Sequence, residues 1–176
     1  MKVVYLFPTI EEAKAFILTE PKAPVFISGV GMAAVAAAVL RAVKSKRPGL
    51  LILAGTAGAY DPELLPGEVV EVVREEVAGL PERYAESYAV EPLTELRPVT
   101  ALTVSRSGEG TEFARVKGAQ IENMEGAAFF AVCDALGVEC AELRAISNRV
   151  GQPFGEWRTE EALANLTEIL ARTTFE

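Results

Sequence analysis

The amino-acid sequence predicts an α/β fold in a single domain over residues 1–176. Three observations indicate it: short apolar runs alternate with helical patterns, glycine-rich turns follow two of those runs, and 50% of the residues are hydrophobic. A chain of 176 residues fits one core, and no linker, repeat or low-complexity tract divides it. We therefore expect a sheet with helices packed against it.

The first elements are a strand over residues 2–7 and a helix over residues 10–18. Thr9 precedes the helix and is a suitable N-cap. Glu11 and Glu12 fall in the first turn, where acidic side chains also occur because they suit the helix dipole. The pattern alone therefore leaves both a structural and a catalytic role open for Glu12.

A second strand over residues 24–28 runs into a glycine-rich turn and an alanine-rich helix. Gly29, Gly31 and Ala34 match the spacing of the dinucleotide-binding fingerprint. That fingerprint is incomplete here, because the next strand, residues 50–54, does not end on an acidic residue. Close packing of the helix against the sheet is the simpler interpretation of the small residues.

The strand over residues 50–54 is followed by a second glycine-rich stretch, which we expect to be a turn. Backbone N–H groups of such a turn, together with the Thr56 hydroxyl, can hold an anion or a water. Further strands are predicted over residues 68–73 and 99–105. Between them, residues 74–98 are rich in charge, proline and glycine, and predict a surface excursion or a subunit contact.

Residues 121–151 are the most informative part of the chain. Asn123 can cap a helix, Glu125 falls in its first turn, and Gly137 ends it. The helix has no polar stripe, so we expect it to be buried on most sides. Its apolar residues are Ala127, Ala128, Phe129, Phe130, Val132 and Cys133.

A strand over residues 140–147 follows, and Glu142, Arg144 and Asn148 are expected on one of its faces. Ligands of α/β sheets bind beyond the carboxyl ends of the strands, which favours a binding role for Arg144 and Asn148. The alternative is structural: Arg144 would pair with Glu142 or Glu125.

The end of the chain predicts a loop with Phe154 and Trp157, then an amphipathic helix over residues 160–171 with Thr159 as its cap. Trp157 is either an anchor of the core or a wall of a site.

Composition limits the possible functions. The net charge of −8 argues against nucleic acid and anionic membrane surfaces as partners, and no apolar run is long enough to span a membrane. The chain has no histidine, which removes imidazole catalysis and histidine metal sites. Two cysteines in buried elements and the absence of a charged leader indicate a reduced, cytoplasmic setting.

The runs NMEGAAFF, residues 123–130, and LRAISN, residues 143–148, resemble the purine nucleosidase and nucleoside phosphorylase superfamily, and within it most closely the futalosine hydrolases. The resemblance implies a three-layer nucleoside phosphorylase-like fold, with a central mixed twisted sheet flanked by helices. It also implies hydrolysis of a nucleoside substrate without metal or cofactor, by a homodimer or higher homo-oligomer.

The same resemblance assigns catalytic roles. Glu12 would activate the attacking water, held with Arg144 and Thr56. Phosphorylases of the superfamily carry an arginine three residues before that hydroxyl, whereas this chain has Leu53, so water is the expected nucleophile.

The resemblance also implies which residues contact the substrate. Glu125 would accept hydrogen bonds from the ribose hydroxyls, Met124 would pack on the sugar, and Trp157 would cover its 5′ end. Ser147 and Asn148 would face the purine. An amide donates to a 6-oxo group and accepts from N7–H, so Asn148 favours a 6-oxopurine such as hypoxanthine over adenine.

Alternatives within the fold are a nucleosidase of the methylthioadenosine/S-adenosylhomocysteine type and a purine nucleoside phosphorylase. An alternative of another class is a non-catalytic nucleotide-binding module using the turn at Gly29 and Gly31. The aryl carboxylate tail of futalosine has three candidate partners, Arg83, Arg106 and Arg149, besides a residue of a second subunit.

Overall fold

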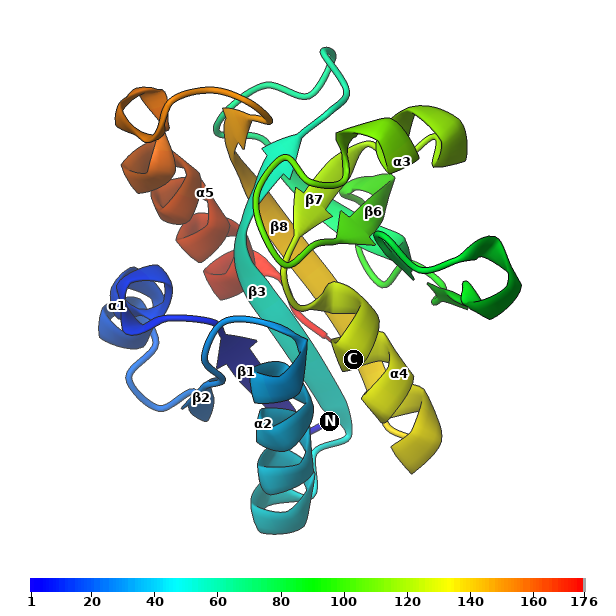
Figure 1. Ribbon diagram of the computed structural model, residues 1–176. Coiled ribbons are helices and arrows are strands. Elements are labelled where there is room, and N and C mark those ends of the chain that lie inside the picture. The colour runs from blue at the N-terminus through cyan, green and yellow to red at the C-terminus, as the bar shows by residue number, and fades with distance from the viewer. Residues whose placement is uncertain (176) are drawn as a thin grey trace.

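The computed structural model describes residues 1–175, which form one eight-stranded sheet and five α-helices (Figure 1). The strands are β1 Val3–Phe7, β2 Val25–Ile27, β3 Leu50–Ala59, β4 Val69–Val77, β5 Ser87–Ala89, β6 Arg97–Thr103, β7 Ile121–Asn123 and β8 Glu139–Arg149. The α-helices are α1 Ile10–Thr19, α2 Met32–Lys46, α3 Thr111–Lys117, α4 Gly126–Leu136 and α5 Thr159–Arg172, and short 3-10 turns span Glu82–Tyr84 and Phe154–Glu156.

The sheet is mixed, as predicted. β1 pairs in parallel with β2 and β3, and β3 pairs in parallel with β8. β8 then runs antiparallel to β4, β4 parallel to β6, β6 parallel to β7, and β7 antiparallel to β3. Five strands, β3, β8, β4, β6 and β7, therefore form a closed ring of pairings, in which the two longest strands, β3 and β8, are neighbours.

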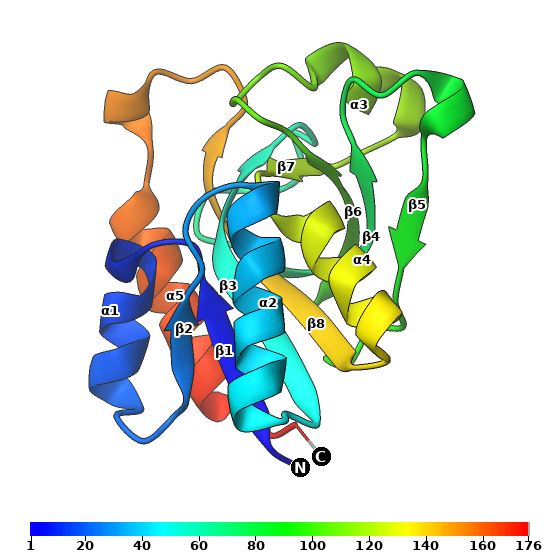
Figure 2. The same ribbon diagram turned by 60° about the horizontal axis from the view of Figure 1, so that its bottom comes forward.

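Helices cover both faces of the sheet. α2 packs against α4 in front of the strands, while α1 packs against α5 on the other side (Figure 2). Buried residues of β3 alternate between the two sides: Leu51 and Leu53 belong to the core under α2 and α4, and Leu50 and Ile52 to the core under α1 and α5. The alternation explains why this strand is apolar at every position.

The turn predicted after residue 54 was wrong, because β3 continues to Ala59. Gly55 and Gly58 are extended strand residues and neither has a positive φ. The reason is tertiary: β3 pairs with β8 as far as Arg149, with one register shift between Ala57 and Gly58. The glycines here do not form a turn. They instead leave room for neighbouring side chains to approach the strand closely, as described below for the active site.

Two helix starts differ from the prediction. α4 begins at Gly126, yet Asn123 still caps it at a distance, since its Oδ1 accepts from the backbone N–H groups of Glu125 at 2.9 Å and Gly126 at 2.7 Å. Thr159 was wrong as a cap, because α5 already includes it. The chain is fixed there by the backbone N–H of Arg158, which donates to the Ser147 carbonyl at 2.7 Å.

The segment 74–98 contains the rest of β4 and the short edge strand β5, so part of it belongs to the sheet. α3 and β7 were not predicted, because elements of seven and three residues are too short to show a period. None of the helices in residues 1–175 is both long enough and apolar enough to cross a membrane.

Candidate active site

A cavity of about 560 Å³ opens where the start of α1, the later half of β3, the β7–α4 junction and the end of β8 meet. All eight side chains singled out in the sequence line it, although they come from five separate segments. They are Glu12, Thr56, Met124, Glu125, Arg144, Ser147, Asn148 and Trp157.

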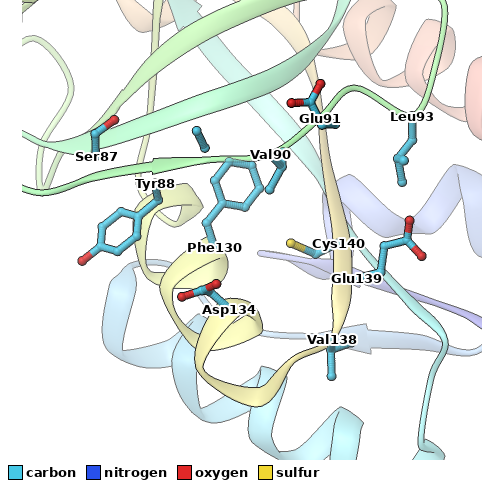
Figure 3. Close-up of a pocket in the computed structure, with 11 residues that line it drawn as sticks. Ser87, Tyr88, Val90, Glu91, Leu93, Phe130, Asp134, Val138, Glu139 and Cys140 are labelled. Atoms are coloured by element: carbon cyan, nitrogen blue, oxygen red, sulfur yellow. The ribbon is translucent and has the colours of Figure 1, made fainter.

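A second cavity, of about 440 Å³, lies between β5, α4 and the start of β8 (Figure 3). Its charged lining consists of Glu91, Asp134 and Glu139, and its other residues are apolar, tyrosine, serine or cysteine. Carboxylates without a cation or amide beside them do not form a convergent site, so the first cavity is the candidate active site.

Glu12 is held at both carboxylate oxygens. Its Oε1 accepts from the backbone N–H of Thr56 at 2.9 Å and from the Thr56 hydroxyl at 3.1 Å. Its Oε2 accepts from the Thr9 hydroxyl at 2.9 Å, and the Glu12 N–H donates back to Thr9 at 3.2 Å. The predicted N-cap is therefore confirmed, and it also orients the carboxylate.

Arg144 is 1% exposed, and each of its three side-chain nitrogens donates a hydrogen bond. Nε donates to Glu142 Oε1 at 2.7 Å, and Nη1 to the Thr56 carbonyl at 3.2 Å. Nη2 donates at 3.1 Å both to Asn123 Oδ1 and to Glu125 Oε2. Burial opposes the charge, but Glu142 and Glu125 outweigh it and raise the Arg144 pKa above its usual value. Arg144 thus makes both predicted ion pairs and still lines the cavity.

Gly55 lets Arg144 and Glu12 approach each other. A Cβ at this position would lie 2.8 Å from Arg144 Nη1 and 3.0 Å from Glu12 Oε1. Any larger residue would displace one of them, so the glycine that suggested a turn instead makes room for both charged groups.

Glu125 bridges two distant parts of the chain. Its Oε2 receives Arg144, and its Oε1 accepts from the backbone N–H of Gly31 at 3.1 Å, at the start of α2. Gly31 has a φ of 95°, which only glycine adopts readily. In the fingerprint-like turn, the N–H that a phosphate would need is therefore bonded to a carboxylate.

Ser147 and Asn148 lie at the end of β8, just past the register shift with β3. The Ser147 hydroxyl donates to Asn148 Oδ1 at 2.8 Å, and Asn148 Nδ2 donates to the Arg149 carbonyl at 3.0 Å. These bonds fix the amide orientation and leave one N–H and one acceptor position on the side chain.

Glu122 is a lining residue that the sequence analysis missed. It is 4% exposed and accepts from the Tyr60 hydroxyl at 2.5 Å, the Ser107 hydroxyl at 2.8 Å and the Gly108 N–H at 2.9 Å. Burial and this carboxylate raise the pKa of Tyr60. The only sequence signal was an acidic residue next to a helix start, on a strand too short to recognise.

Trp157 lies outside the apolar core clusters, so the core-anchor interpretation was wrong. Its ring packs 5.1 Å from that of Phe154, which also lines the cavity, and its Nε1 donates to the Gln152 carbonyl at 3.1 Å.

The three arginines considered for the aryl carboxylate tail, Arg83, Arg106 and Arg149, do not line the cavity. Arg149 instead donates to the Pro62 carbonyl at 2.8 Å.

Comparison with known proteins finds one matching family model, the phosphorylase superfamily, over residues 7–91 and 99–174. A futalosine hydrolase of Thermus thermophilus is 51% identical over 69 residues, which are 39% of this chain and 31% of that protein. A futalosine hydrolase of Streptomyces coelicolor is 32% identical over 179 aligned positions, covering 82% of this chain and 75% of that protein. The chain thus spans less than a third of the first relative and three quarters of the second.

Solved structures share the fold at low identity. A 5′-methylthioadenosine/S-adenosylhomocysteine nucleosidase from Helicobacter pylori superposes with a TM-score of 0.85 at 16% identity, over 97% of this chain and 96% of that one. The futalosine hydrolase of the same organism gives 0.82 at 16% identity, over 97% and 95%.

Proposed function

Because this chain belongs to the phosphorylase superfamily, we propose that it is an N-ribosyl hydrolase that cleaves the glycosidic bond of futalosine and releases hypoxanthine. The observation that carries the proposal is the hydrogen-bonded series Glu12, Thr56, Arg144 and Glu125, whose members line the same cavity as Asn148.

Cleavage of an N-ribosyl bond passes through a ribosyl cation, so the site needs an oriented water, anionic groups near the sugar, and help for the leaving base. Glu12 takes the proton of the water, because Thr9 and Thr56 fix its carboxylate at the cavity wall. Glu125 accepts hydrogen bonds from the sugar hydroxyls, and Met124 packs beside it.

Water is favoured over phosphate by the charges that face the cavity. Leu53 is fully buried where phosphorylases carry a cation, and Arg144, the one cationic side chain of the described lining, is already paired with Glu125 and Glu142. A phosphate would meet Glu12 and Glu125 without a free counter-charge.

Asn148 supports a 6-oxopurine as the base. Its amide is fixed by Ser147 and Arg149, and its remaining N–H and acceptor position match O6 and N7–H of hypoxanthine. Ser147 holds that amide, and Trp157 and Phe154 form the apolar side of the cavity where the 5′ substituent would lie.

The proposal also covers the domain arrangement, the cellular compartment and the assembly of the protein. The described residues, 1–175, form one nucleosidase domain with a three-layer arrangement, supported by core clusters on both faces of one sheet. The protein works in the cytoplasm, supported by two buried free thiols, Cys133 and Cys140. It assembles as a homodimer or higher homo-oligomer, which sedimentation analysis tests directly.

The experiment is incubation with futalosine, inosine and methylthioadenosine, with and without phosphate, followed by identification of the products by mass spectrometry. Hypoxanthine and free dehypoxanthine futalosine without phosphate are the expected result. A sugar phosphate would indicate a phosphorylase, adenine release an adenine-type nucleosidase, and no base release a nucleotide-binding module.

A further inference from the structure

Glu122, on the short strand β7, is a buried carboxylate of the cavity wall to which the proposed mechanism gives no task. Its donors are the Tyr60 hydroxyl, the Ser107 hydroxyl and the Gly108 N–H. Burial and this carboxylate raise the pKa of Tyr60, so Tyr60 keeps its proton and donates. All three donors are uncharged, so none of them neutralises the carboxylate. A carboxylate in such a position is suited to receive a donor from a ligand.

The pairing of three neighbouring strands brings Glu122 beside Asn148. Gly58 on β3 pairs with Glu122 on β7 and, on its other side, with Asn148 on β8. Side chains of residues paired directly across neighbouring strands share a face, so Glu122 and Asn148 rise on the same side of the sheet with Gly58 between them. Their α-carbons are two strand spacings apart, roughly 10 Å. All three residues line the cavity.

Gly58 keeps the space between the two side chains open. A Cβ at this position would lie 3.2 Å from Asn148 Nδ2 and 3.5 Å from Glu122 Cγ. Any side chain here would therefore stand between the amide and the carboxylate. With glycine, the backbone of β3 forms a floor that a planar base can approach closely, and the base can then meet both polar groups with its edge.

The polar edge of a 6-oxopurine matches this pair. In the proposed function Asn148 contacts O6 and N7–H, and the next polar atom around the ring after O6 is N1, which carries a hydrogen in hypoxanthine. A carboxylate has roughly four acceptor positions, so the three donors of Glu122 leave one for this N–H. In adenine the same ring position is an unprotonated nitrogen, whose lone pair would face the carboxylate oxygen.

We propose that Glu122 is a second residue that determines base specificity: its carboxylate accepts the N1–H of a 6-oxopurine while Asn148 contacts O6 and N7–H. The substrate class is thereby narrowed to nucleosides whose purine has a 6-oxo group and a hydrogen on N1. Tyr60, Ser107 and Gly108 hold the carboxylate in place for this contact. The inference rests on the proposed function, which places the purine at Asn148.

Binding of free bases, measured by calorimetry, tests the inference without turnover. The unaltered protein is compared with E122Q and with E112Q, which removes a carboxylate from the exposed surface of α3 and is the matched control. In E122Q the amide can still bond to the Tyr60 and Ser107 hydroxyls, and its NH₂ group can donate to N1 of adenine. We expect the ratio of the adenine Kd to the hypoxanthine Kd to fall by about tenfold or more in E122Q and to stay unchanged in E112Q.

A base methylated at N1 is the second probe. The methyl group replaces the hydrogen that Glu122 would accept, so the unaltered protein should bind 1-methylhypoxanthine about tenfold or more weakly than hypoxanthine. In E122A, which removes the carboxylate and leaves space for the methyl group, this difference should shrink to about threefold or less. An equal difference in both proteins, or an unchanged base ratio in E122Q, would overturn the proposal.

These measurements also separate the inference from the proposed function. Preference for hypoxanthine that depends on Glu122, without cleavage of futalosine, would support the base contact and contradict the hydrolase. Cleavage of futalosine with the same base ratio in E122Q and the unaltered protein would support the hydrolase and contradict the role of Glu122. An unaltered protein that binds adenine as tightly as hypoxanthine would contradict that role as well.

Discussion

Thr56 directs two hydrogen bonds onto a single oxygen of Glu12, from its backbone N–H at 2.9 Å and from its hydroxyl at 3.1 Å. The same residue gives its carbonyl to Arg144 at 3.2 Å. One strand residue therefore sets the relative position of the two charged groups, which explains why β3 must remain a regular strand at this point.

Replacing Glu12 by glutamine tests the general base. E12Q keeps the shape of the side chain but cannot take a proton, so we expect kcat to fall by about 10²- to 10⁴-fold. Nucleoside binding, measured by calorimetry, should remain detectable. E20Q removes the same charge at the exposed end of α1 and is the matched control. Turnover by E12Q at the level of E20Q would exclude Glu12 from the chemistry.

Replacing Thr56 by valine removes the hydroxyl and keeps the backbone N–H. A hydrogen bond to a charged group contributes about 1.5–3 kcal/mol, so a kcat loss of about tenfold or more is expected for T56V. T19V, which removes a hydroxyl at the end of α1, controls for the substitution itself. If the two variants have the same kcat, the Thr56 hydroxyl does not orient the base.

Replacing Asn148 by aspartate tests the choice of purine. The amide that donates to the Arg149 carbonyl becomes a carboxyl, which must carry a proton to keep that bond and presents a different pattern to the base. A change of about 1 to 3 kcal/mol in the kcat/KM ratio, from 6-oxo toward 6-amino nucleosides, is expected. N165D is the matched control, because Asn165 also donates to a backbone carbonyl, that of Gly67, but lies away from the cavity. Equal loss on both substrates in N148D would contradict the assignment.

Much of this site was predictable, because it lies at the ends of long elements. The buried helix α4 and the strand β8 have clear patterns, and they carry Glu125, Arg144 and Asn148. Glu75, whose carboxyl meets that of Glu142, could not be found in this way, since the charged run REE at the end of β4 is typical of a surface, yet this side chain is fully buried. Its environment comes from β6, β7 and β8, and pairings so distant in sequence leave no local signal.

Replacing Gly126 by alanine tests the enclosure of the carboxyl pair. The added methyl group would overlap Glu75 Oε1 and Glu142 Oε2, so one of them must move or lose its bonds. Such overpacking costs about 1–3 kcal/mol, a fall in Tm of several degrees for a chain of this size. G155A, where a Cβ would meet nothing within 4 Å, should leave Tm unchanged. Equal Tm values for the two variants would show that the carboxyl pair is not enclosed by the start of α4.

The pH dependence of stability tests whether the buried carboxyl pair, Glu75 and Glu142, retains a proton in the folded protein. Burial raises the pKa of Glu142 above 4.5, against the effect of Arg144 and with the help of Glu125, and burial also raises that of Glu75. The folded protein therefore keeps a proton that the unfolded chain releases near pH 4.5. The contribution of this proton to the free energy of unfolding is fully present below that pH. It is lost as the pH rises through the folded pKa, by up to about 1.4 kcal/mol per pH unit.

The variant E142Q isolates this effect, because the glutamine side chain does not titrate. Its free energy of unfolding, from urea titrations between about pH 5 and 8, should therefore gain on that of the unaltered protein as the pH rises. E20Q gives the baseline for removing one exposed charge. A difference between E142Q and the unaltered protein that stays constant across this range would mean that the pair Glu75 and Glu142 holds no extra proton in the folded protein.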